Sequence, residues 1–110
     1  MPIYISRGRY SAESIKNLVA NPEDRLSAVR NVVEAAGAKL LNFYLTLGQY
    51  DFLIITEAPS AKEASAAFLA AAASGSITDN EMTEAFTTAE AKEVFAIAGK
   101  AAEKYKLPGK

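Results

Sequence analysis

The sequence contains no cysteine, no histidine and no tryptophan among its 110 residues. Without cysteine there is no disulfide, no thiolate nucleophile and no cysteine metal ligand. Without histidine there is no imidazole base, no histidine-bound zinc and no haem held by a proximal histidine. We therefore predict that the protein uses no cofactor, neither haem nor a transition metal, and that any ligand is a small organic molecule.

An excess of charge of one sign is also missing. Twelve Lys and Arg residues stand against 13 Asp and Glu residues, for a formal charge of −1. Nucleic-acid-binding domains usually show a strong basic excess, so we predict no nucleic-acid partner. Half of the residues are hydrophobic, which is typical of a folded globular protein and argues against disorder.

Long hydrophobic runs are absent as well. The alanine-rich run 64–73 is interrupted by Ser65 and is shorter than the ~20 residues that span a bilayer. The segment 1–7 lacks the charged region and apolar stretch of a signal peptide. We expect a complete cytoplasmic protein that does not bind membranes. No Gly/Ser-rich or Pro-rich linker divides the chain, so we predict a single domain over residues 1–110.

Four segments have the patterns of β-strands, at residues 2–9, 39–47, 51–57 and 77–87. In the second, Leu41, Phe43, Leu45 and Leu47 are predicted to share one face. The third is apolar on both faces, which predicts a central strand that is covered on both sides. The fourth is polar and is predicted to be an edge strand, whose acidic residues Asp79, Glu81 and Glu84 discourage sheet-to-sheet aggregation rather than bind a metal.

Capping signals place helices between and after these strands. Each predicted helix start has a residue whose side chain can accept a backbone N–H bond, and the candidates are Ser11, Asn21 before Pro22, Ser60 with Glu63, and Thr87 with Glu90. Gly37 and Gly75 stand where a left-handed residue would end a helix.

The resulting order, β-α-β-β-α-β-α with the first helix split at Pro22, predicts an α+β fold of the ferredoxin-like split βαβ type. It has a four-stranded antiparallel sheet, helices on one face and an extra C-terminal helix. The other face must meet water, a ligand or another chain. Because Tyr4 and Tyr44 lie opposite the apolar face of their strands, we expect two sheets to stack into a dimeric α+β barrel, as a homodimer or a higher multiple. The alternative is a monomer with exposed tyrosines.

The segment FYLTLGQYD at residues 43–51 resembles the GYD-domain family, whose Gly-x-Tyr-Asp signature stands here as Gly48, Tyr50 and Asp51. Three other segments also resemble the family and occur in the family's order along the chain, at residues 4–11, 57–59 and 85–87. Gly8 departs from the pattern, because a larger apolar residue is expected there. The resemblance covers roughly residues 2–98 and implies a ferredoxin-like, dimeric α+β-barrel domain. It implies little about activity, because the family is largely uncharacterised.

The signature loop has two interpretations. In the structural one, Gly48 supplies a positive φ, Asp51 bonds nearby backbone N–H groups and Tyr50 packs across the loop. In the functional one, Tyr50 and Asp51 lie at the mouth of a pocket, with Asp51 as a base or ligand anchor. Arg7 and Arg9 at the end of the first strand are either solvated charges or a clamp for a carboxylate or phosphate.

We therefore predict a small dimeric protein that binds a small molecule or serves as an assembly module. The alternative is a cofactor-free oxygenase or isomerase acting on a small aromatic or carbonyl compound. Its polar groups would be Tyr4, Arg9, Tyr44 and Asp51, and Tyr50 is a further ligand-binding candidate. A closed apolar pocket with one carboxylate facing it would favour the enzyme.

Overall fold

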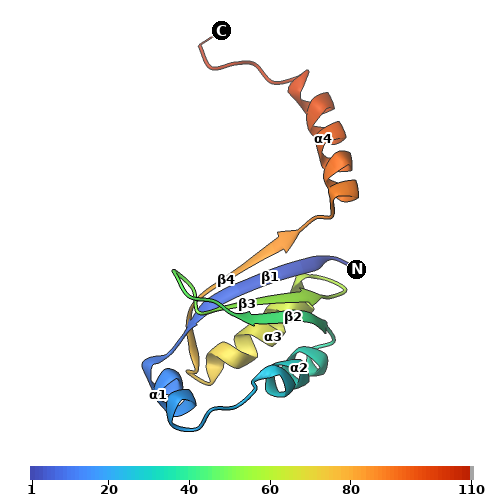
Figure 1. Cartoon of the computed structure of the whole chain (residues 1–110). Coiled ribbons are helices and arrows are strands. Elements are labelled where there is room, and N and C mark those ends of the chain that lie inside the picture. Colours follow the sequence, from blue (N-terminus) through green and yellow to red (C-terminus); the bar gives the residue numbers. More distant parts are fainter. Residues whose placement is uncertain (110) are drawn as a thin grey trace.

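The computed structural model describes residues 1–109 and confirms the predicted α+β, ferredoxin-like architecture (Figure 1). The elements are β1 (Ile3–Tyr10), α1 (Ala12–Ala20), α2 (Leu26–Ala35), β2 (Lys39–Leu45), β3 (Phe52–Glu57), α3 (Ala61–Ala73), β4 (Ile77–Ala85) and α4 (Thr88–Ala102). The strand order is β2-β3-β1-β4, and all neighbouring strands are antiparallel. The apolar strand β3 is internal and the polar strand β4 is an edge, as the sequence predicts.

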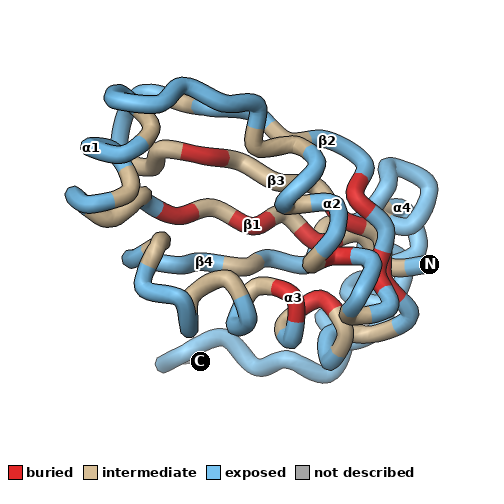
Figure 2. Tube along the Cα trace, turned by 90° about the horizontal axis from the view of Figure 1, so that it is seen from below, coloured by how far each residue is buried: buried red, intermediate tan, exposed pale blue. Residues whose placement is uncertain are grey.

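Helices α2 and α3 cover one face of the sheet, and the core lies between them and the sheet (Figures 1 and 2). Along β1, buried and half-buried residues alternate, so one face looks toward the helices and the other away from them. We call the second surface the open face. Strand alternation and register place on it Ile3, Ile5, Arg7, Tyr44, Leu53, Ile55 and Glu81.

Tyr4 is not on the open face, and that prediction is wrong. Its side chain is 3 % exposed and belongs to the core, with Val33 of α2 and Ala64 of α3. The alternation within β1 is confirmed, but its direction is the reverse of the predicted one. Ile3 and Ile5 face away from the helices, because β1 buries its Tyr4, Ser6 and Gly8 positions instead.

The predicted face of β2 is also wrong at one end. The register between β2 and β3 shifts between Leu40 and Asn42, which is the mark of a β-bulge that leaves one extra residue, Leu41, in the strand. Leu40 is therefore buried and Phe43 packs against the same core, although the two are three positions apart and would lie on opposite faces of a regular strand. Leu41 is 36 % exposed.

Local capping chemistry explains most helix ends. The Ser11 side chain accepts the Ser14 N–H at 3.1 Å, Ser60 accepts the Lys62 N–H at 3.3 Å, and Thr87 forms a capping box with Glu90. At Ser60 the predicted box is not formed, because Glu63 accepts a hydrogen bond from the serine hydroxyl instead. The positive φ values of Gly37 and Gly75, +88° and +79°, confirm their predicted roles.

The predicted helix start at Asn21 is wrong. Asn21 is the C-cap of α1, and α2 begins only at Leu26, whose N–H donates to the Asp24 carboxylate at 2.9 Å. An aspartate that bonds the backbone two residues on forms a turn that competes with helix. The four residues from Pro22 therefore form a connection and not the first turn of a helix.

Gly8 is explained by its neighbour Phe52. A Cβ built on Gly8 would stand 2.7 Å from Phe52 Cζ and 2.7 Å from Asn80 Oδ1. The Phe52 ring is almost completely buried and is held between the rings of Tyr10 and Phe68, at centroid distances of 5.4 and 6.4 Å. The larger apolar residue expected at position 8 has no room, because the phenylalanine ring of β3 occupies that space.

Helix α4 stands apart from the rest of the molecule (Figure 1). None of its residues is buried, and Figure 2 colours it almost entirely as exposed. The Cα radius of gyration is 17.8 Å and the longest extent is 61 Å, whereas a compact chain of this length has a radius of gyration of about 13 Å. The extra length comes from the separation of α4.

Candidate functional site

The signature loop between β2 and β3 is tied to strand β1 by backbone and carboxylate hydrogen bonds. The Asp51 carboxylate accepts the Tyr10 N–H at 3.0 Å, and the Asp51 N–H donates to the Gly8 carbonyl at 2.8 Å. The Thr46 hydroxyl closes the loop by donating to the Tyr50 carbonyl at 2.7 Å. The bond from the Tyr10 N–H is the one expected if Asp51 has a structural role, in which its carboxylate bonds nearby backbone N–H groups. Gly48 does not have the predicted positive φ, and that part of the interpretation is wrong.

Tyr50 crosses from the loop to the edge strand β4. Its hydroxyl donates to the Glu81 carboxylate at 2.6 Å, and the Arg7 guanidinium carbon lies 5.9 Å from its ring centroid, within cation–π reach. The hydrogen bond to Glu81 is the main cause that raises the pKa of the Tyr50 hydroxyl above its ordinary value. Arg9 contacts the same loop through the Gln49 carbonyl, at 3.4 Å. Arg7 and Arg9 are thus engaged with the loop.

The predicted site residues do not form one pocket. Arg9 and Tyr50 share a shallow surface depression with Glu81 at the loop end of the sheet. Tyr4 is in the core, where burial is the main cause that raises the pKa of its hydroxyl. Tyr44 is 53 % exposed on the edge strand β2. The Asp51 carboxylate does not line the depression, and it accepts a hydrogen bond from the Tyr10 backbone N–H.

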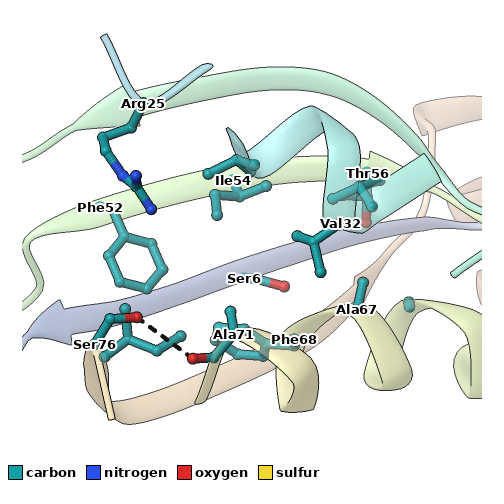
Figure 3. A pocket seen from close by; sticks show the side chains of 14 residues that line it. Ser6, Arg25, Val32, Phe52, Ile54, Thr56, Ala67, Phe68, Ala71 and Ser76 are labelled. Atoms are coloured by element: carbon teal, nitrogen blue, oxygen red, sulfur yellow. Dashed lines mark hydrogen bonds between the residues drawn. The ribbon is translucent and has the colours of Figure 1, made fainter. Parts of the chain in front are cut away.

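A different cavity lies between the sheet and the helices α2 and α3 (Figure 3). The cavity itself has a volume of about 70 Å³, and the space that includes its open mouth is about 580 Å³. Its walls are mainly apolar side chains, including Val32, Phe52, Ile54 and Phe68, and its polar lining residues are Ser6, Arg25, Thr56 and Ser76. No carboxylate lines it among the residues that the structure describes.

The polar groups of this cavity are arranged from its interior to its rim. Ser6 and Thr56 are each 5 % exposed and stand on the wall formed by β1 and β3. Arg25 occupies the N-cap position of α2, and in Figure 3 its guanidinium points toward Phe52. One guanidinium nitrogen contacts Glu23 at 3.3 Å, which leaves other N–H donors of the fork for a guest molecule.

Tyr10 connects the signature loop to this cavity. Its N–H is held by Asp51, and its ring packs on Phe52, a cavity-lining residue. Burial raises the pKa of the Tyr10 hydroxyl, while the positive charge of Arg25 opposes the shift and Asp51 adds to it. The signature loop therefore fixes one end of the cavity wall without contributing a side chain to the lining.

Sequence reasoning missed Arg25, Ser6 and Thr56. A signal for the two hydroxyls was available, because each is a small polar residue at an inward position of an internal strand. Arg25 has no such local signal, since only the packing of α2 on the sheet brings it to the rim.

Two negative findings concern the described part of the chain. Within residues 1–109 no three acidic side chains come together as a possible metal site, and register places Glu84 beside Tyr4, on the face opposite Glu81. None of the four helices is long and apolar enough to cross a bilayer.

Comparison with known proteins gives a family and a fold. The family model described as the GYD domain matches residues 4–95. The structure resembles MtbAldR, with a TM-score of 0.56 at 7 % identity, over 78 % of this chain and 52 % of that one. It also resembles TTHA0845 from Thermus thermophilus, with a TM-score of 0.51 at 15 % identity, over 79 % of this chain and 95 % of that one. The chain spans about half the length of MtbAldR. No curated protein sequence matches it.

Proposed function

The chain belongs to the GYD-domain family, and from that premise we propose that it is a homodimeric small-molecule-binding module whose ligand enters the cavity between the sheet and helices α2 and α3. The observation that carries the proposal is a mainly apolar cavity with one arginine at its rim and hydroxyls on its wall. Pockets of this composition, apolar with a few placed polar groups, are typical of ligand sites.

The lining also indicates the chemical class of the ligand. A guanidinium pairs best with a planar anion such as a carboxylate, through two parallel hydrogen bonds. The Ser6 and Thr56 hydroxyls can each donate and accept one bond deeper inside, and the rest of the wall favours an apolar body. The ligand is therefore a small, mostly apolar organic acid, with its carboxylate at Arg25.

The cofactor-free oxygenase or isomerase has less support from this geometry. Such chemistry needs a group that takes a proton within hydrogen-bond reach of the substrate. No carboxylate lines the described cavity, and the Asp51 carboxylate holds the Tyr10 backbone outside it. Binding without chemistry is the function that these residues favour.

The open face supports the homodimer. Ile3, Ile5, Leu53 and Ile55 are only half-buried there, and the exposed Tyr44 continues the surface onto β2. Apolar patches of this kind mark association surfaces on soluble proteins. A second copy, stacked open face to open face, would remove these side chains from water and form the α+β barrel. Light scattering that shows only a monomer at micromolar concentration would contradict this proposal.

Binding is tested with phenylacetate, a small aryl carboxylate, and with phenylacetamide, its neutral analogue. In calorimetric or NMR titrations of the wild-type protein, we expect phenylacetate to bind more tightly. Arg25→Met keeps the aliphatic stem but removes the charge, and should weaken phenylacetate binding about tenfold. That is the low end of the ~1.5–3 kcal/mol for a hydrogen bond to a charged group, because Arg25 is partly exposed.

The matched control is Arg30→Met, on an arginine of α2 that is exposed and does not line the cavity. It should bind phenylacetate as the wild type does. Equal losses in the two variants, or equal affinity for the acid and the amide, would show that Arg25 does not anchor the ligand.

A further inference from the structure

Helix α4 forms from its own local signals and yet lacks a packing partner. The Thr87 side chain accepts the Glu90 N–H at 3.1 Å, and the Thr87 N–H donates to the Glu90 carboxylate at 2.9 Å. A helix of 15 residues is nevertheless marginal in water unless an amphipathic face packs on something. A single chain therefore does not supply the packing that would stabilise this helix.

The helix has a clear apolar stripe. At 100° per residue, one side collects the residues Ala91, Val94, Phe95, Ala98, Ala102 and, beyond the helix end, Tyr105. Phe95 is 73 % exposed and Val94 is 41 % exposed. The opposite side carries Glu93, Ala96 and Lys100. A stripe with this spacing is typical of a helix that packs against protein.

Within residues 1–109, no other element of the chain covers this stripe. Only Phe86 and Thr87 separate β4 from α4, and the backbone of Thr87 is extended, with φ −65° and ψ 163°. An N-cap residue adopts this extended geometry, so the chain is still extended at Thr87, directly before α4 begins. Figure 1 shows the result, a helix that continues beyond the end of β4 and away from α2 and α3.

We infer that α4 is an arm that docks by its apolar stripe on a second copy of this chain. The inference deepens the homodimer proposed above and rests on that part of the proposed function. A second copy is the partner that satisfies both unpartnered apolar surfaces of the molecule, the open face and the α4 stripe, in one assembly.

Interface area favours the same occupant. Four strands about 4.8 Å apart and about six residues long give the open face a planar footprint of roughly 400 Å² per chain. Two such faces bury roughly 800 Å², less than the ~1,200–2,000 Å² of a stable specific interface. Each α4 is about 22 Å long and about 10 Å wide, so docking would bury roughly 200 Å² of the helix and roughly 200 Å² of the partner surface beneath it. Two reciprocal arms bring the total to roughly 1,600 Å².

The test compares Phe95→Asp with Ala96→Asp in the full chain. Both variants place the same charge on α4, the first within the apolar stripe and the second on the opposite side, where Ala96 is exposed. In sedimentation equilibrium we expect the wild type and Ala96→Asp to be dimers of equal affinity. Phe95→Asp should raise the dimer dissociation constant by about 100-fold or more, because two aromatic side chains per dimer lose their contacts. Equal affinities of the two variants would overturn the inference.

A second measurement does not depend on a destabilising variant. Because the protein has no cysteine, Gly99→Cys provides a unique spin-label site on α4, at an exposed position with no heavy atom within 4 Å of an added Cβ. Spin-labelled chains are mixed with ¹⁵N-labelled chains that carry no spin label. We expect broadening of amides within residues 2–85 of the ¹⁵N chain. The absence of broadening in these mixed samples would overturn the inference. So would broadening that is seen only when the spin label and the ¹⁵N label are in the same chain.

The outcomes separate this inference from the proposed function. A wild-type monomer would refute both the arm and the homodimer. A dimer that Phe95→Asp leaves intact would refute the arm alone. Phenylacetate binding at the cavity is measured independently in both α4 variants, so its loss or survival tests the small-molecule site and not the arm.

Discussion

Replacing Gly8 by alanine tests how tightly the sheet and the aromatic cluster are packed. The added Cβ would stand 2.7 Å from Phe52 Cζ and from Asn80 Oδ1, and the next nearest atom is Phe52 Cε2 at 3.1 Å. The asparagine oxygen is the end of an exposed, rotatable side chain and can move away. The Phe52 ring cannot, because it is 2 % exposed and packs between Tyr10 and Phe68.

The expected loss follows from these contacts. Overpacking of a well-filled core costs about 1–3 kcal/mol, and the lower entropy of the unfolded chain returns about 0.4–1 kcal/mol when alanine replaces glycine. We therefore expect Gly8→Ala to lower the free energy of unfolding by about 1–2 kcal/mol in urea titrations followed by circular dichroism.

A double-mutant cycle identifies the cause. Phe52→Leu removes the ring atoms that the new Cβ would meet, so the cost of Gly8→Ala should be smaller in the Phe52→Leu background, with a coupling of at least about 0.5 kcal/mol. Additive losses would refute the argument that Phe52 excludes a side chain at position 8. Wild-type stability of Gly8→Ala would do the same.

Two further predictions concern the signature loop and the last helix. Asp51→Asn should lower the free energy of unfolding by about 1–3 kcal/mol, because the charge that accepts the Tyr10 N–H is lost. Asp79→Asn serves as its control, since asparagine tolerates the positive φ of 52° at that position; equal losses in the two variants would contradict a special role of Asp51. The Thr87 backbone N–H is the main cause that lowers the pKa of Glu90 below its ordinary 4.5, so the capping box should be fully formed above pH 4.5 and weaken as the pH falls through the lower, folded-state value. An NMR titration of the Glu90 carboxyl carbon should show this lower midpoint, and a midpoint at or above 4.5 would contradict it.

The sequence predicted what depends on short-range signals. Strand alternation, the caps at Ser11 and Thr87 and the glycines that end helices are properties of a few neighbouring residues, and the structure confirms them. The order of these elements predicted the ferredoxin-like fold, and the family resemblance implied the same fold; the strand order bears it out.

The errors came from features that need the folded chain. Alternation cannot tell which side of β1 meets the helices, so Tyr4 was placed on the wrong face. The bulge at Leu41 is visible only in the pairing with β3. The cavity requires α2 and α3 to be packed on the sheet, and the same packing brings Arg25 to its rim.

The two edges of the sheet differ in a way that limits how copies can join. β4 carries Asp79, Glu81 and Glu84, and its pairing with β1 is irregular, so another strand is repelled there. β2 carries one charge, Lys39, and otherwise presents residues such as Tyr44 and Leu45. If copies paired strand to strand into an open-ended sheet, every copy would need two edges that accept another strand. With a single receptive edge, strand addition stops at a closed, two-fold pair.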